Sequence, residues 1–133
     1  MNISPFTGKW SYRSFLNNPD LSVEFNELRF GAGNLVLEQP QFGEVEGTLG
    51  EDSWSLDLKG GSSYGSPFEI RFQGSGIINE ELWVYDYHGF LAPKWPNGNN
   101  QRAAILGTIV RTVPHSNGQA EAGYVASWIA VKN

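Results

Sequence analysis

The chain has 133 residues, 40% of them hydrophobic and 14% aromatic, so it can bury the core of one folded domain, which we take to span residues 1–133. Its net charge is −5 and it contains no run of Lys or Arg, which argues against nucleic acid as a partner because phosphate binding needs clustered positive charge. The absence of cysteine excludes a disulfide scaffold and a thiolate metal site, and no apolar run reaches the roughly 18 residues of a membrane span.

Apolar and polar residues alternate along most of the chain, which is the pattern of half-buried β-strands. No long segment keeps a helical period. We predict strands over the segments 8–15, 25–31, 34–39, 44–50, 54–59, 68–77, 82–91, 102–112 and 123–132. The pattern indicates an all-β protein, a single antiparallel up-and-down β-barrel of about eight strands. A closed antiparallel barrel needs an even number of strands, so either one of these nine segments is misassigned or the barrel closes in parallel.

The predicted connections alternate in length. The longer ones are 15–24, 39–43, 60–67 and 92–101, and the tight ones are 31–33, 51–53 and 78–81. Alternate connections of an up-and-down barrel lie at the same end, so we expect the longer ones to share one rim, with 113–122 as a long loop at the other end. Because ligands commonly enter at the mouth of a barrel, the rim of long loops is the expected entrance.

The last strands are apolar on both faces. In 82–91 and 123–131, large apolar side chains occupy odd and even positions alike, which is typical of strands covered on both sides. We expect a homo-oligomer that forms through the outer faces of 82–91, 102–112 and 123–131. The alternative is that a loop covers these strands.

Two motifs resemble the calycin superfamily, which includes lipocalins, fatty-acid-binding proteins and avidins. Gly8-Lys9-Trp10 is similar to its Gly-x-Trp start, and 105–110 followed by 124–130 is similar to the closing hairpin of avidin-like barrels. The resemblance implies that Trp10 plugs the closed end, that Arg111 stacks on Trp10, and that Trp128 lines a ligand site. It covers only the two ends of the chain, and the remaining biotin-binding positions have no counterpart here.

One strand carries the residues best suited to acid–base chemistry. Asp86 and His88 are two positions apart and therefore share a face. If that face is interior, the carboxylate could orient the imidazole as an acid or base, and otherwise they are a hydrogen-bonded pair on an outer wall. In the opposite facing, Tyr85 and Tyr87, with Trp83, line the cavity instead.

Further candidates for ligand contact lie on the expected rim and inside the barrel. Arg102 follows the 92–101 loop, and its planar fork suits a carboxylate. Trp95 lies between two prolines of that loop and is costly to leave in water, so we expect it to act as a lid or a subunit contact, with Tyr64 on the same rim. Tyr12 and Ser14 share a face with Trp10 and are candidate polar contacts.

We expect the protein to bind a small molecule, apolar or aromatic and with or without a carboxylate, in the barrel cavity. One alternative is a cofactor-independent isomerase or cyclase that uses Asp86 and His88, or a tyrosine, as acid and base. Another is a structural or interaction module with a filled barrel. We expect no cofactor and no metal, since His88 and His115 are the only histidines and lie at opposite ends. The N-terminus lacks a basic region followed by an apolar stretch, which favours a cytoplasmic protein, although a processed secreted form would look the same.

Overall fold

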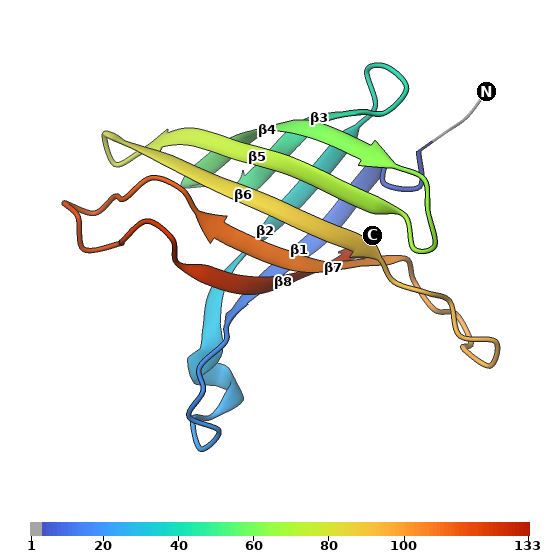
Figure 1. Cartoon of the computed structure of the whole chain (residues 1–133), viewed down its shortest axis with the longest axis horizontal. Helices are drawn as coiled ribbons and strands as arrows, with labels where there is room; N and C mark the ends of the chain where they lie inside the picture. Colours follow the sequence, from blue (N-terminus) through green and yellow to red (C-terminus); the bar gives the residue numbers. More distant parts are fainter. Residues whose placement is uncertain (1–3) are drawn as a thin grey trace.

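The computed structural model describes residues 4–133, which form one closed antiparallel barrel (Figure 1). The strands follow one another around the barrel in chain order, and β8 pairs with β1. This architecture is consistent with a calycin-like fold. The strands are β1 (Gly8–Leu16), β2 (Arg29–Glu38), β3 (Glu44–Glu51), β4 (Trp54–Ser63), β5 (Glu69–Ile78), β6 (Glu81–Leu91), β7 (Ala104–Arg111) and β8 (Val125–Lys132), and a short 3₁₀ helix, η1 (Phe25–Leu28), precedes β2.

The prediction of two strands over 25–31 and 34–39 is wrong. Residues 25–28 form η1, and a single strand, β2, runs straight through Gly31 and Gly33, where we expected a tight turn. Gly33 pairs with Tyr12, and a Cβ at Gly33 would lie 3.0 Å from the Gly50 carbonyl oxygen and 3.3 Å from the Trp54 ring. The glycine therefore permits close strand packing rather than a reversal of the chain. The barrel therefore has an even number of strands, and every pair of neighbouring strands is antiparallel.

This correction changes which connections share an end. The connections 17–28, 52–53, 79–80 and 112–124 lie at one end, which we call the His115 end. The connections 39–43, 64–68 and 92–103 lie at the other, which we call the Trp10 end. The expectation that the longer loops share one rim is wrong, because the connection after β1 lies opposite the other long ones.

Trp10 lies in the core of the barrel at the Trp10 end. Its side chain is fully buried, and its indole N–H donates a hydrogen bond to the Phe6 carbonyl oxygen at 2.9 Å. The Lys132 ammonium lies 5.5 Å from the centre of the Trp10 ring. The expectation that Arg111 stacks on Trp10 is wrong, because Arg111 is the last residue of β7 and faces the interior at the opposite end.

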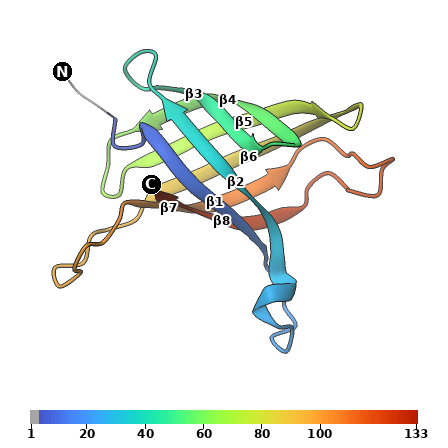
Figure 2. The ribbon, with the colours of Figure 1, turned by 180° about the vertical axis from the view of Figure 1, so that it is seen from behind.

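Two connections project from the barrel wall (Figures 1 and 2). One is 17–28 with η1, and the other is the β6–β7 connection, 92–103. Leu21, Phe25 and Trp95 expose 95%, 88% and 67% of their surface on these projections. Among residues 4–133, the structure contains no helix with the length and apolar character of a membrane span.

Candidate ligand-binding cavity

A cavity of about 560 Å³ occupies the barrel at the His115 end. Its volume falls within the range of ligand sites in proteins, about 300–1,000 Å³. The strands turn six aromatic side chains into it. The aromatic lining comes from β1, β2, β4 and β6 and consists of Tyr12, Phe30, Trp54, Trp83, Tyr85 and Tyr87, whereas the polar lining includes Ser14, Arg111 and His115.

Tyr85, Arg111 and His115 form one hydrogen-bonded network in this cavity. Tyr85 and Arg111 are partners in the register of β6 and β7, so both side chains point inward. The Arg111 Nε–H donates to the Tyr85 hydroxyl at 3.2 Å, and that hydroxyl lies 2.8 Å from His115 Nε2. Arg111 Nη1 also donates to the Glu121 carbonyl oxygen at 3.2 Å.

A tight turn in the β7–β8 connection holds the imidazole of His115 in place. His115 and Ala120 form an isolated β-bridge, and the Glu81 carboxylate accepts the backbone N–H groups of Ser116 and Asn117 at 2.9 and 3.0 Å. The imidazole stacks on Trp83, with ring centres 3.7 Å apart and planes at 7°. The stacking on Trp83 and the hydrogen bonds of both ring nitrogens, to Tyr85 and Ser116, therefore fix the orientation of the ring.

His115 is held in its neutral form near pH 7. Burial, and to a smaller extent the nearby Arg111 guanidinium, lowers the pKa of His115 below its ordinary value, and the Glu81 carboxylate partly offsets this. Two proton arrangements satisfy the network. In one, the Tyr85 hydroxyl donates to Nε2. In the other, Nε2–H donates to Tyr85, whose own proton is then free for a ligand, and Nδ1 accepts from the Ser116 hydroxyl 2.9 Å away.

Arg111 is a buried cation without a carboxylate partner among residues 4–133. Only 7% of its surface is exposed, and the ion pairs in the described part of the chain join Glu69 to Arg71 and to His88. Its guanidinium carbon lies 5.2–5.7 Å from the ring centres of Phe30, Tyr85 and Tyr124. Such contacts contribute about 0.5–2 kcal/mol each, whereas burying an ion costs several kcal/mol.

Besides Arg111, which lacks a carboxylate partner, two buried polar atoms of the cavity lining have no hydrogen-bond partner at all within residues 4–133. They are the Tyr12 hydroxyl and the Trp83 indole nitrogen. Burial raises the pKa of Tyr12 to about 12; the hydroxyls of Ser14 and Tyr87 lie close enough to offset this in part, although neither completes a hydrogen bond of good geometry. Burial also raises the pKa of Tyr87 well above its ordinary value, so both phenols stay neutral and can donate to a ligand.

The structure brings five of the sequence-predicted residues together at the cavity: Tyr12, Ser14, Trp83, Tyr85 and Tyr87. Trp128 lies in the core beside them rather than in the lining. Its ring centre is 5.8 Å from that of Tyr12, and its indole N–H donates to the Thr108 carbonyl oxygen at 2.9 Å.

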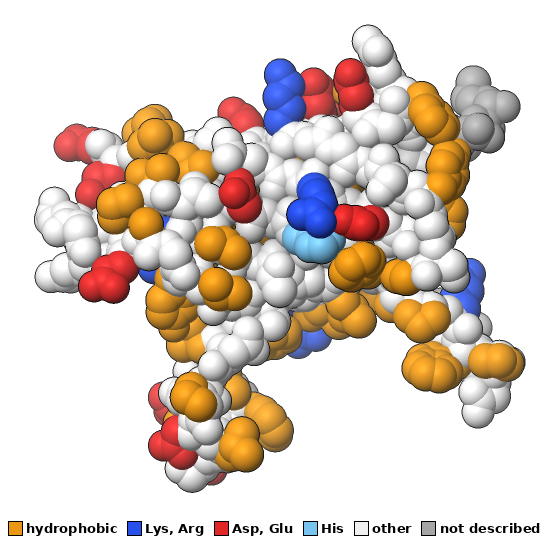
Figure 3. Space-filling model, viewed as in Figure 1, with side chains coloured by type: hydrophobic (Ala, Val, Ile, Leu, Met, Phe, Trp, Pro, Cys, Tyr) orange, Lys and Arg blue, Asp and Glu red, His pale blue; other side chains and the backbone are white. Residues whose placement is uncertain are grey.

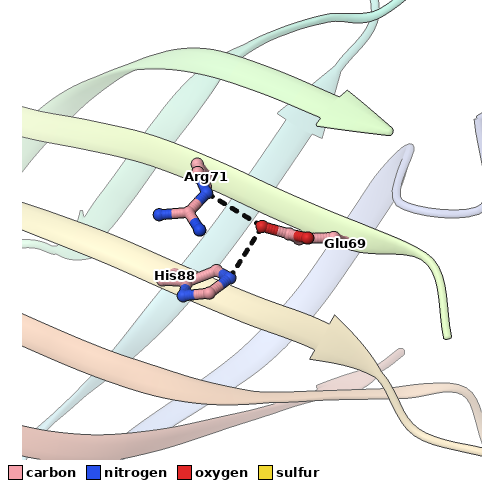
Figure 4. Close-up of polar contacts among 3 residues, drawn as sticks. All are labelled: Glu69, Arg71 and His88. Atoms are coloured by element: carbon pink, nitrogen blue, oxygen red, sulfur yellow. Dashed lines mark hydrogen bonds and ion pairs between the residues drawn. The ribbon is translucent and has the colours of Figure 1, made fainter. Parts of the chain in front are cut away.

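Asp86 and His88 lie on the outer wall of the barrel, and Figure 4 shows His88 beside Glu69 and Arg71. The interior facing of Asp86 and His88, which the sequence left open, is wrong, because Tyr85 and Tyr87 occupy the interior face of β6. Asp86 accepts a hydrogen bond from Gln73 at 2.9 Å. His88 Nε2 lies 2.9 Å from the Glu69 carboxylate, which also pairs with Arg71 at 2.8 Å. The alternative expectation is therefore right about the outer wall but not about the pairing, because Asp86 bonds Gln73 and His88 bonds Glu69.

Tyr64, Trp95 and Arg102 lie at the Trp10 end, away from the cavity lining. Tyr64 packs against Phe68, with ring centres 5.3 Å apart, and Arg102 Nη1 reaches the Lys132 carbonyl oxygen at 3.5 Å. Trp95 is exposed on its loop and does not cover the cavity.

Sequence reasoning missed Arg111 and His115 as cavity residues. The 113–122 connection, which carries His115, was expected at the end away from the mouth, and Arg111 was expected to stack on Trp10. The signal that could have found them is the 113–122 connection, which is long enough to return a side chain over the mouth.

Comparisons of the chain with models of protein families, with curated proteins and with solved structures find no match. Within the described residues, no three His, Cys, Asp or Glu side chains gather in a way that could hold a metal ion.

Proposed function

We propose that the protein binds a small apolar or aromatic molecule inside a calycin-like barrel. The supporting observation is the cavity of about 560 Å³, lined by aromatic side chains and by polar atoms that lack partners within residues 4–133. Buried polar atoms are normally hydrogen-bonded, so these atoms favour a ligand or water as their partner. A structural module with a filled barrel would leave no such space.

Binding of the neutral fluorescent probe N-phenyl-1-naphthylamine tests this proposal. A side chain at Gly31 would enter the cavity, where an added Cβ meets only the Ser14 hydroxyl oxygen, at 3.3 Å. Gly31→Leu should weaken probe binding at least tenfold relative to the wild type. The matched control is Ser55→Leu, which adds the same side chain to an exposed position of β4. No saturable binding to the wild type, or equal loss in both variants, contradicts the proposal.

A second function, acid–base catalysis on the bound molecule, is favoured by one contact. The Tyr85 hydroxyl lies 2.8 Å from His115 Nε2 in the cavity, so a proton can pass between them. An isomerase leaves the mass of its substrate unchanged. The small molecules extracted from cells should therefore include one whose chromatographic retention changes when it is incubated with the wild-type protein but not with His115→Asn. No change with either protein rules this function out.

We also propose that the outer faces of β6, β7 and β8 contact a second copy of the chain. Phe90, Leu106 and Val125 expose 40%, 45% and 51% of their surface there. Hydrophobic side chains also cover both projecting connections and the barrel between them (Figure 3). Isolated apolar side chains are common on surfaces, but a continuous apolar band favours an interface.

A further inference from the structure

We infer that the cavity takes a ligand with a carboxylate group, which Arg111 binds together with the Tyr85 hydroxyl, while the apolar body of the ligand extends towards Tyr12 and Tyr87. This inference rests on the proposed function and names the ligand class. Arg111 is then the cation of the site in place of Arg102, which lies at the other end of the barrel.

The first argument is the charge of Arg111. Its guanidinium is buried and lines the cavity, yet no carboxylate within residues 4–133 pairs with it. Glu51 lines the same cavity but forms no ion pair within the described residues, and the Glu81 carboxylate holds the backbone N–H groups of Ser116 and Asn117. The aromatic rings and the one backbone carbonyl that contact Arg111 reduce the cost of burying its guanidinium, but they carry no net negative charge. Buried charges in proteins are normally paired, so the missing partner is expected from outside the chain.

The second argument is the number of unused donors. A guanidinium has five N–H groups, and Arg111 uses one on Tyr85 and one on Glu121. The remaining N–H groups of the fork match the two oxygens of a carboxylate. The Tyr85 hydroxyl adds a further donor when His115 takes the tautomer protonated at Nε2, in which the Tyr85 proton is not needed by the imidazole.

The third argument is the arrangement of the rest of the cavity. Arg111 ends β7 near the mouth, whereas Tyr12 and Tyr87 lie midway along β1 and β6. Trp54 and Leu56 add apolar lining from β4. A carboxylate at Arg111 therefore places an apolar body against the aromatic faces of Tyr12 and Tyr87.

A matched pair of probes tests the inference. Sodium 2-naphthoate and 2-naphthamide share one aromatic body and differ in charge. By isothermal titration calorimetry at pH 7.5, the wild type should bind naphthoate at least tenfold more tightly than naphthamide. Arg111→Met should bring the ratio close to one. The matched control is Arg13→Met, which removes an exposed arginine from the outer face of β1, away from the cavity, and should keep the preference.

The outcomes separate the two proposals. Equal affinity of the wild type for both probes, or a preference that survives Arg111→Met, overturns the carboxylate site and leaves cavity binding intact. Binding of neither probe overturns both. One measurement needs no variant: the NMR resonance of the Arg111 Nε–H in the wild type should shift with naphthoate and much less with naphthamide. Equal shifts contradict the inference.

Discussion

The hydroxyls of Tyr12 and Tyr85 lie in one cavity but differ in what they do for the fold. The Tyr85 hydroxyl joins Arg111 to His115, whereas the Tyr12 hydroxyl has no partner within residues 4–133. A buried polar group that loses its partner carries the full cost of its desolvation, but a group without a partner carries that cost already. The two positions should therefore respond differently to the same substitution.

Tyr85→Phe should lower the free energy of unfolding by about 1–3 kcal/mol, because it leaves the Arg111 Nε–H and His115 without their shared partner. Tyr12→Phe removes an unsatisfied hydroxyl and should leave stability unchanged or raised. Urea denaturation followed by tryptophan fluorescence measures both. Equal losses in the two variants would show that the network around Tyr85 does not stabilise the fold.

His115 should make the fold less stable in mild acid. Its pKa is lowered in the folded protein, so the unfolded chain binds the proton more readily as the pH falls below the ordinary value, about 6.5. Its contribution to stability is present above that pH and is lost as the pH falls towards the folded pKa. The Tm of His115→Gln should depend less on pH between 7.5 and 5.5 than that of the wild type. An unchanged slope in His115→Gln contradicts the assignment.

Among the elements, β7 depends on a glycine where two strands approach closely. A Cβ at Gly107 would collide with the carbonyl oxygen of His88, an atom of the neighbouring strand that cannot move alone. Gly107→Ala should therefore lower the free energy of unfolding by about 1–3 kcal/mol, the cost of overpacking. Gly31→Ala, on β2, has room in the cavity and should cost less than half as much. Thermal unfolding compares the two, and equal costs would contradict the close approach.

For strands with one polar face, the sequence predicted both the strand and its inward face, whereas for strands that are apolar on both faces it predicted the strand but not the face. In β3, β4 and β5 the alternation set both the element and its inward face, as at Leu49, Leu56 and Ile70. In β6 both faces carry large apolar side chains, so period two could not decide between Tyr85 and Asp86 for the interior. In the sequence, Gly31 and Gly33 resemble a turn. Only the positions of the neighbouring strands explain why these residues are glycines.

The candidate site was harder to predict than the fold for the same reason. Reading β2 as two strands moved the 17–28 connection to the wrong end and with it the expected mouth. Tyr12 and Ser14 were found because alternation places them on the same face as Trp10, whereas Tyr85 and Tyr87 were named only as one of two possible facings of their strand. His115 belongs to a connection, where no period indicates direction, and its position depends on the Glu81 contacts.

The whole molecule has a large surface for its mass. The 14.7 kDa chain exposes 8672 Å², whereas a compact monomer of this mass exposes about 6,900 Å². The two projecting connections, with Leu21, Phe25 and Trp95 exposed, account for part of this excess. A second copy packed between these projections would bury apolar area that the single chain leaves in water.

Leu106→Lys should therefore shift the protein towards the monomer, because it places a charge in the centre of the outer face of β7. The matched control is Val36→Lys, an outward-facing position on β2 away from the proposed interface. Size-exclusion chromatography with light scattering measures the mass of each. A monomeric wild type, or equal dissociation of both variants, contradicts the proposed contact.

Occupancy of the barrel is the central claim, and native mass spectrometry of the full chain taken directly from cell extract tests it most directly. The wild type should carry an added small-molecule mass that gentle denaturation releases, and that mass should be absent from Gly31→Leu and present in Ser55→Leu. A wild-type spectrum that shows only the mass of the chain, or an added mass that persists in Gly31→Leu, would contradict a ligand in the cavity.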